Sequence, residues 1–163
     1  MSTIFSIRRI LIVSASIVTL SGCATQFGPL SVADTIAARS ELSTLNSLVV
    51  KAGLIDTLKG TGPFTVFAPT NAAFAKVPAK TMDELGKDPA KLKAVLTYHV
   101  VPGKVLAAEV KNGNAKTVNG TNLALSKAGA FVTVEDGMVQ TADLSATNGV
   151  VHIIDSVLIP AAR

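Results

Sequence analysis

GPFTVFAPTNAAF, at residues 62–74, places a strand directly before a helix. Residues 64–67 are β-branched or aromatic and alternate in character, which is typical of a strand. Pro69 ends that strand because proline cannot donate to a strand ladder. Thr70 or Asn71 can then accept hydrogen bonds from the first free amides of a helix. The stretch therefore predicts a strand that leads into a short capped helix.

Helical signals surround this stretch in the N-terminal half. Ser31 and Asp34 have the spacing of a capping box. Ser43 is a candidate cap for a second helix, and Asp88-Pro89 places an acid and a proline where a third helix would begin. The helical spacing of apolar residues supports both later helices, at Leu45, Leu48, Val49 and Ala52, and again at Leu92, Val95 and Leu96.

Strand signals dominate the C-terminal half. Asn119-Gly120 separates two β-prone segments, as in a hairpin. Residues 135–137 separate a second such pair, and residues 150–158 form the most β-branched stretch of the chain. Helices early and strands late, with strands near Thr65 and Val100, predict an α+β fold with a mostly antiparallel sheet.

The composition fits one domain and argues against nucleic-acid binding. The chain has 163 residues, of which 48% are hydrophobic, so a sizeable core can form. The net charge is +4, but Arg8 and Arg9 belong to a segment that we expect to be removed. Without these two of the 15 basic residues, 13 face 11 acidic ones, a net charge of +2. No basic run interleaved with aromatics occurs, so nucleic acid is not an expected partner.

The N-terminus has the three parts of an export signal. Arg8 and Arg9 precede an uncharged apolar run at residues 10–20, which is short for a membrane span. Leu20-Ser21-Gly22-Cys23 follows and resembles the lipobox of bacterial lipoproteins. We therefore expect residues 1–22 to be a lipoprotein signal peptide and Cys23, the only cysteine, to carry lipid. The alternative is an ordinary secretory signal that happens to end in cysteine.

Residues 23–30 would then be the lipidated N-terminus and a short linker. Residues 24–30 span at most about 25 Å when fully extended, so the domain would stay close to its membrane. Ala24 follows the cysteine where aspartate would typically retain a lipoprotein in the inner membrane. This favours the outer membrane if the host is Gram-negative, with the domain facing either the periplasm or the cell surface.

Three segments together resemble the fasciclin domain family. Residues 62–74 are similar to its first sequence box, Tyr98-His99-Val100-Val101-Pro102-Gly103 resembles its central motif, and residues 148–160 resemble its second box. The resemblance covers residues 31–160 and extends to bacterial lipoproteins and the single-domain secreted antigens of mycobacteria. It implies two β-sheets in a wedge flanked by several short helices. The residues that carry the two boxes are expected to be structural: Thr65, Phe67, Pro69, Thr70, Asn71, Phe74, Asn148, Gly149, His152, Asp155 and Pro160.

The sequence offers no catalytic or metal-binding constellation. His152 and Ser156 would share one face of a strand about 13 Å apart, with Asp155 on the other face. Such an arrangement cannot relay a proton, so we predict no catalytic residues and no enzyme. His99 and His152 are the only histidines and are expected to be buried imidazoles bonded to the backbone. Neither a metal nor any other cofactor is expected.

Tyr98 and His99 are the candidate binding residues. They match the motif that animal members of the resembled family use in adhesion to integrins. The interpretation that we favour is nevertheless structural, with Tyr98 in the core and its hydroxyl satisfied. For Asp155, we expect a buried carboxylate that accepts from backbone amides or a hydroxyl near the first box and so joins the two boxes.

The resemblance implies a binding module for adhesion to a protein or polysaccharide of the envelope or extracellular matrix. The chain is expected to be a monomer. The alternatives are an envelope accessory protein and a carrier of a small ligand or lipid, which would need an apolar cavity with a few polar groups.

Overall fold

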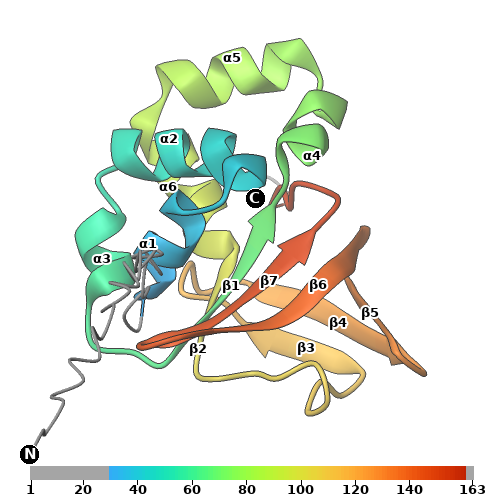
Figure 1. The fold of residues 1–163 in the computed structure, drawn as a ribbon. Helices are drawn as coiled ribbons and strands as arrows, with labels where there is room; N and C mark the ends of the chain where they lie inside the picture. The colour runs from blue at the N-terminus through green and yellow to red at the C-terminus, as the bar shows by residue number, and fades with distance from the viewer. Residues whose placement is uncertain (1–29, 161–163) are drawn as a thin grey trace, which may run out of the picture.

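Helices occupy the N-terminal half of the chain and strands the C-terminal half, which confirms the predicted α+β class (Figure 1). The computed structural model describes residues 30–160. The expected signal peptide, Cys23 and nearly all of the linker therefore lie outside the described residues. The helices are α1 (Val32–Ala37), the 3-10 helix η1 (Ser40–Leu42), α2 (Ser43–Lys51), α3 (Ile55–Lys59), α4 (Asn71–Lys76), α5 (Ala79–Lys87) and α6 (Pro89–Tyr98). Within residues 30–160, no helix has the length and apolar character needed to cross a membrane.

The strands form a sheet in the order β2-β1-β7-β6-β5-β4-β3. The pair β1–β7, next to the edge strand β2, is parallel, and every other pairing is antiparallel. The strands are β1 (Phe64–Pro69), β2 (Val100–Pro102), β3 (Gly113–Lys116), β4 (Asn122–Ala128), β5 (Phe131–Val134), β6 (Gly137–Ala146) and β7 (Gly149–Ile154).

Strand β6 joins the two sheets of the expected wedge. Its first residues, Gly137 and Met138, pair with β5, whereas its later residues pair with β7. Two register shifts interrupt the β6–β7 pairing, and Asp143, within the second of them, has a φ of 58°. Such irregularities bend a strand, so the sheet divides into two connected parts. At the far edges the parts approach again, because the Val118 amide donates to the Val100 carbonyl at 2.8 Å.

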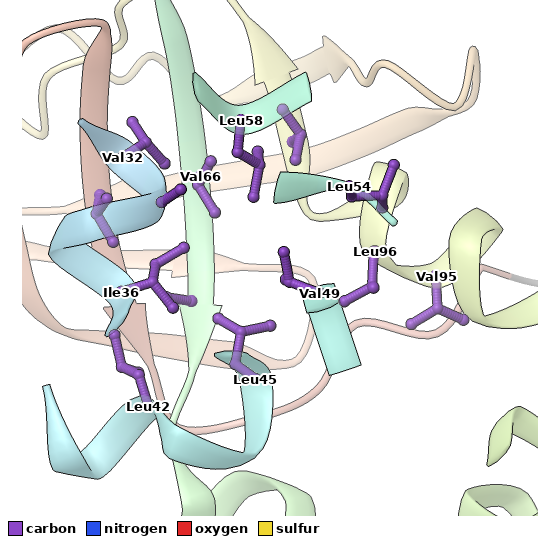
Figure 2. Packing of buried hydrophobic residues seen from close by; sticks show 14 of the residues in the cluster. Val32, Ile36, Leu42, Leu45, Val49, Leu54, Leu58, Val66, Val95 and Leu96 are labelled. Atoms are coloured by element: carbon purple, nitrogen blue, oxygen red, sulfur yellow. The ribbon is translucent and has the colours of Figure 1, made fainter. Parts of the chain in front are cut away.

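Both faces of strands β1 and β7 are buried, each in a separate core. Val66 and Ala68 of β1 and Val151 and Ile153 of β7 face the helices. We call this cluster the helix-side core; Figure 2 shows its residues from α1, α2, α3 and α6 converging on Val66. Phe67 of β1 and Ile154 of β7 face the other way, into a second cluster, the sheet-side core, which contains Phe67, Tyr98, Val101, Val110, Leu123, Leu125, Val132, Val134, Ile154 and Leu158.

Side chains cap the helices both locally and over long distances. Ser31 accepts from the Asp34 amide, and Asp88 accepts from the amides of Ala90 and Lys91, as the sequence predicts. The predicted cap at Ser43 is wrong, because α2 continues directly from η1. The amide of Thr44 instead donates to Asn71 Oδ1, at 3.0 Å.

Strands β1 and β7 begin in unusually close contact. A Cβ atom at Gly149 would overlap the Phe64 carbonyl oxygen, and one at Gly62 would overlap the Asn148 carbonyl oxygen. The Phe64 amide also donates to that Asn148 carbonyl, at 3.0 Å. Glycine at both positions therefore lets the two resembled boxes start side by side.

Candidate functional site

Tyr98 ends α6 and points into the sheet-side core. Its side chain is only 6% exposed, and its hydroxyl lies 3.0 Å from Glu135 Oε1 and 3.2 Å from the Asn122 carbonyl oxygen. Burial, reinforced by the Glu135 carboxylate, raises the pKa of Tyr98 to about 12. The hydroxyl therefore stays protonated and acts as a donor within the fold. Tyr98 presents almost no surface to a partner.

His99 is fully enclosed and links α6 to the C-terminal segment. Its Nε2 accepts from the Leu158 amide at 3.0 Å, so Nδ1 carries the proton and donates to the Val95 carbonyl at 2.7 Å. Burial lowers the pKa of His99 to about 4. The imidazole is thus neutral near pH 7 and both of its nitrogens are occupied by the backbone.

His152 makes the equivalent connection on β7. Its Nε2 lies 2.8 Å from the Val105 carbonyl, and its Nδ1 accepts from the Asp143 amide at 3.2 Å. Its ring stacks on Phe67 with centroids 5.5 Å apart. Burial lowers its pKa, against the opposing effects of the Val105 carbonyl and the Asp143 charge. Both histidines therefore hold the backbone and have no free nitrogen for proton transfer or metal binding.

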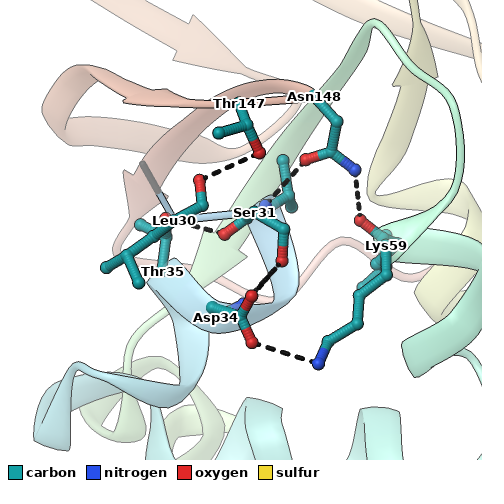
Figure 3. A network of polar contacts seen from close by, with 9 residues as sticks. Leu30, Ser31, Asp34, Thr35, Lys59, Thr147 and Asn148 are labelled. Carbon is teal, nitrogen blue, oxygen red and sulfur yellow. Dashed lines mark hydrogen bonds and ion pairs between the residues drawn. The ribbon is translucent and has the colours of Figure 1, made fainter. Parts of the chain in front are cut away.

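Asn148 joins the start of β7 to two helices (Figure 3). Its Oδ1 accepts from the Val32 amide at the start of α1, at 2.8 Å. Its Nδ2 donates to the carbonyls of Leu58 and Gly60 at the end of α3, at 2.7 and 2.9 Å. One amide group thus satisfies a free donor at the N-terminus of one helix and two acceptors at the C-terminal end of another.

Thr65 and Asp155 hold other segments to the strands. Thr65 is fully buried; its hydroxyl donates to the Gly103 carbonyl and accepts from the Val105 amide. Asp155 is partly exposed and accepts from the Met138 amide at 2.8 Å. That amide lies in β6 instead of the first box, and the hydrogen bond lowers the pKa of Asp155. The connection to the first-box side is made by Lys76, whose Nζ lies 3.5 Å from Asp155 Oδ2.

The remaining box residues lie in β1, in the helix that follows it, and in the C-terminal segment. Thr70 accepts from the Ala73 amide at the start of α4, while Asn71 reaches across to α2. Pro69 ends β1 beside Ile154, and Phe67 and Phe74 are buried in different cores. Pro160, the last described residue, borders an open groove near α5 and α6. These placements bring the two boxes together, but they assemble no set of reactive side chains.

Two features of this region lack a clear signal in the sequence. Glu135 has a φ of 51°, and its carboxylate accepts from both Tyr98 and the Ala124 amide. Phe131 and Met138 lie in strands whose alternating sequence defines two faces, but the alternation does not show which face is buried. The structure leaves Phe131 65% exposed and Met138 46% exposed.

Within residues 30–160, no group of three or more His, Cys, Asp or Glu side chains is arranged to hold a metal ion.

A fasciclin domain model matches residues 40–160, and the chain therefore belongs to the fasciclin domain family. Protein sll1483 of Synechocystis is 43% identical over 135 residues, which cover 80% of this chain and 74% of that protein. Immunogenic protein MPB70 of Mycobacterium bovis is 42% identical over 127 residues, covering 75% of this chain and 65% of the relative. The cell surface glycolipoprotein MPB83 of the same species is 39% identical and is covered over 57% of its length.

A solved structure confirms the fasciclin fold. A pair of FAS1 domains from the insect cell adhesion molecule fasciclin I aligns with a TM-score of 0.63 at 17% sequence identity. The match covers 80% of this chain and 51% of the insect chain. Helix α1 lies before the matched family region, yet Val32 and Ile36 are part of the helix-side core. The folded unit thus includes residues on the N-terminal side of residue 40.

Proposed function

We propose that this protein is an exported, lipid-anchored binding module that attaches to a protein or polysaccharide of the envelope or extracellular matrix. One observation carries the proposal: the polar side chains of the resembled boxes are occupied in holding the fold together. Thr65, His99 and His152 are buried and bonded to the backbone. These contacts support a function that belongs to the surface of the domain and not to a reactive centre.

The outer side of strands β4, β5 and β6 supports this role. Ser126, Thr133 and Met138 are neighbours across the three strands, and Ala128 pairs with Phe131. We call these five residues the outer β face. It carries no charge and includes Phe131, the most exposed large hydrophobic side chain of the described region. Aromatic residues and methionine are enriched where proteins bind partners.

The outer β face can be tested by removing its two large side chains. Replacing Phe131 and Met138 by glutamine should weaken binding to isolated envelope and matrix polysaccharides, or to matrix proteins, by about tenfold or more, the range of an interface hot spot. The control replaces Val50 and Ile159, which are 53% and 48% exposed, in the same way. Equal binding by both double variants and the unaltered protein would show that the partner binds elsewhere.

The proposed lipid anchor at Cys23 has a separate test. Mass spectrometry of the purified protein should find a diacylglyceryl group on Cys23 and no residues before it. The Cys23→Ser variant should leave the membrane fraction, because the remaining chain has no acyl group to bury. An unmodified cysteine with the leader removed would indicate ordinary secretion. The cell surface glycolipoprotein named among the relatives supports a lipid-anchored form.

The alternatives differ in location and in the cavity that they require. The apolar cavity between the helices and β1 has a volume of about 40 Å³, whereas ligand pockets measure roughly 300–1,000 Å³. This enclosed cavity is therefore too small to hold a lipid. Protease digestion of intact cells separates adhesion from an envelope accessory role: the adhesion proposal expects cleavage at the surface. Sedimentation of the lipid-free chain is expected to give a monomer.

A further inference from the structure

The described chain begins in a fixed position beside the turn between β6 and β7. The Leu30 carbonyl accepts from the Thr147 amide at 2.8 Å and from the Thr147 hydroxyl at 3.3 Å. Ser31 then caps α1, so these contacts determine where the preceding residues join the domain. Figure 3 shows Leu30, Thr147 and Lys59 around this point.

An open groove of about 590 Å³ lies at the same place. Residues 59–63 form one side, residues 146–149 form another, and Lys104 completes the lining. Two lysines therefore border the groove, while none of these lining residues is acidic. Thr147 belongs both to the groove and to the contact that fixes Leu30.

The positive charge of the groove is only partly neutralised. Lys59 Nζ lies 3.2 Å from Asp34 Oδ1, and both side chains are close to half exposed. Asp34 belongs to the first turn of α1 and is not among the lining residues of the groove. Lys59, Lys104 and Asp34 together carry one net positive charge beside the point where the described chain begins.

We propose that this groove faces the membrane and binds the anionic headgroup of a phospholipid. The inference rests on the proposed lipid anchor at Cys23. The few residues between Cys23 and Leu30 span at most about 25 Å, so an anchored domain keeps this end near the headgroups. Lysines close to an anionic surface are attracted to it within a Debye length of roughly 8–10 Å. Headgroup binding would set the orientation of the domain and turn its opposite end away from the membrane.

The test measures this orientation in the intact lipidated protein. Once Cys23 carries lipid, a Thr61→Cys substitution supplies a single thiol at the groove for an environment-sensitive fluorophore. The protein is reconstituted into vesicles of phosphatidylcholine, with or without phosphatidylglycerol. We expect the fluorophore to report a membrane environment with phosphatidylglycerol, and to lose much of that signal at high salt.

Charge variants identify the groove as the source of the signal. Replacing Lys59 and Lys104 by glutamine should lower the docked-to-undocked ratio about 25-fold, because each lysine contributes about fivefold. The matched control makes the same change at Lys80 and Lys87 of α5, which lies at the opposite end from the described N-terminus in Figure 1. Circular dichroism verifies that each variant is folded.

The outcomes separate this inference from the proposed function. A signal that is independent of phosphatidylglycerol, or that falls equally in both lysine variants, overturns headgroup binding and leaves the anchor intact. If mass spectrometry finds no lipid on Cys23, the anchor fails instead. Vesicle flotation of the unlipidated chain then decides the groove: flotation that requires phosphatidylglycerol and Lys59 with Lys104 supports headgroup binding, and its absence overturns it.

Discussion

At the scale of single residues, Asn148 connects the start of β7 to two helices. Its amide group bonds to α1 and to the end of α3 through three hydrogen bonds. An Asn148→Ala change leaves the Val32 amide and two carbonyls without these partners. We expect it to lower the free energy of unfolding by about 3 kcal/mol, measured by urea denaturation at neutral pH.

Asn114 provides the control for that substitution. It lies exposed on β3, so Asn114→Ala should change the free energy of unfolding by less than about 0.5 kcal/mol. Equal losses in the two variants would mean that the hydrogen bonds of Asn148 contribute no more than an exposed amide does.

His99 should make the protein sensitive to mild acid. Its pKa is about 4 when folded because of burial, against an ordinary value near 6.5 in the unfolded chain. The unfolded state therefore binds more protons between these values, and stability falls as the pH drops from 6.5 toward 4. The loss amounts to about 3 kcal/mol for His99 alone, and His152 acts in the same direction. Urea denaturation across this range measures it.

The carboxylates act in a lower pH window. The Ser31 hydroxyl lowers the pKa of Asp34, and the Met138 amide lowers that of Asp155. Their contributions to the free energy of unfolding are complete above the unfolded pKa near 3.9 and are lost as the pH falls below it.

Because the carboxylates titrate below this range, a His99→Gln variant tests the assignment to His99. Its free energy of unfolding should decline less steeply between pH 6.5 and 4, even if the variant is less stable at pH 7. An unchanged slope would contradict the assignment to His99.

At the scale of secondary structure, Asn71 connects two helices that are distant in sequence. It begins α4, but its side chain accepts from the Thr44 amide and donates to the Ser40 carbonyl near the start of α2. Asn71→Ala should therefore destabilise the protein by about 1 kcal/mol, the usual cost of losing a cap. Hydrogen exchange should accelerate at the first amides of α2.

Thr70 provides the comparison with Asn71, because Thr70 caps its own helix and Asn71 caps a distant one. Its hydroxyl accepts from the Ala73 amide within α4. Thr70→Ala should accelerate exchange at the start of α4 and leave the Thr44 amide protected. Faster exchange at Thr44 in both variants would indicate that α2 and α4 open together, so that the cap at Asn71 has no separate effect.

The same distinction explains how far the sequence predicts the fold. Ser31 and Asp88 bond to amides within three positions, so their spacing is sufficient to predict those caps. Asn148 bonds to an amide 116 positions away, and Asn71 to one 27 positions away. Such partners depend on how the strands are ordered in space, which local periodicity does not contain. The three resembled segments supply this missing information, because they identify the family and the family implies the order of the strands.

The sequence predicts the buried residues of the candidate site better than its exposed surface, because surface features also depend on how distant segments pack. Tyr98 and the two histidines are large or amphipathic side chains within apolar segments, so burial with satisfied polar atoms was the expected outcome. The exposure of Phe131 could not be inferred, because alternation along a strand marks two faces without showing which one is covered. The groove at Lys59 and Lys104 joins segments that are far apart in the chain.

At the scale of the whole molecule, two cores depend on the same two strands. Strand β1 contributes Val66 to the helix-side core and Phe67 to the sheet-side core, and β7 contributes Ile153 and Ile154 in the same way. Losing either core removes the support on one face of both strands. The protein should therefore unfold as one cooperative unit, although its sheet is bent into two parts.

One large-to-small substitution in each core tests this cooperativity. Leu45→Ala in the helix-side core and Leu125→Ala in the sheet-side core should each lower the free energy of unfolding by about 2–4 kcal/mol. Native-state hydrogen exchange would follow the amides of Leu96 in α6 and Val132 in β5. If the cores are coupled through β1 and β7, either substitution reduces the protection of both amides by the same free energy. If Leu45→Ala reduces the protection of the Leu96 amide but not that of the Val132 amide, the bent sheet can persist after the helices have opened.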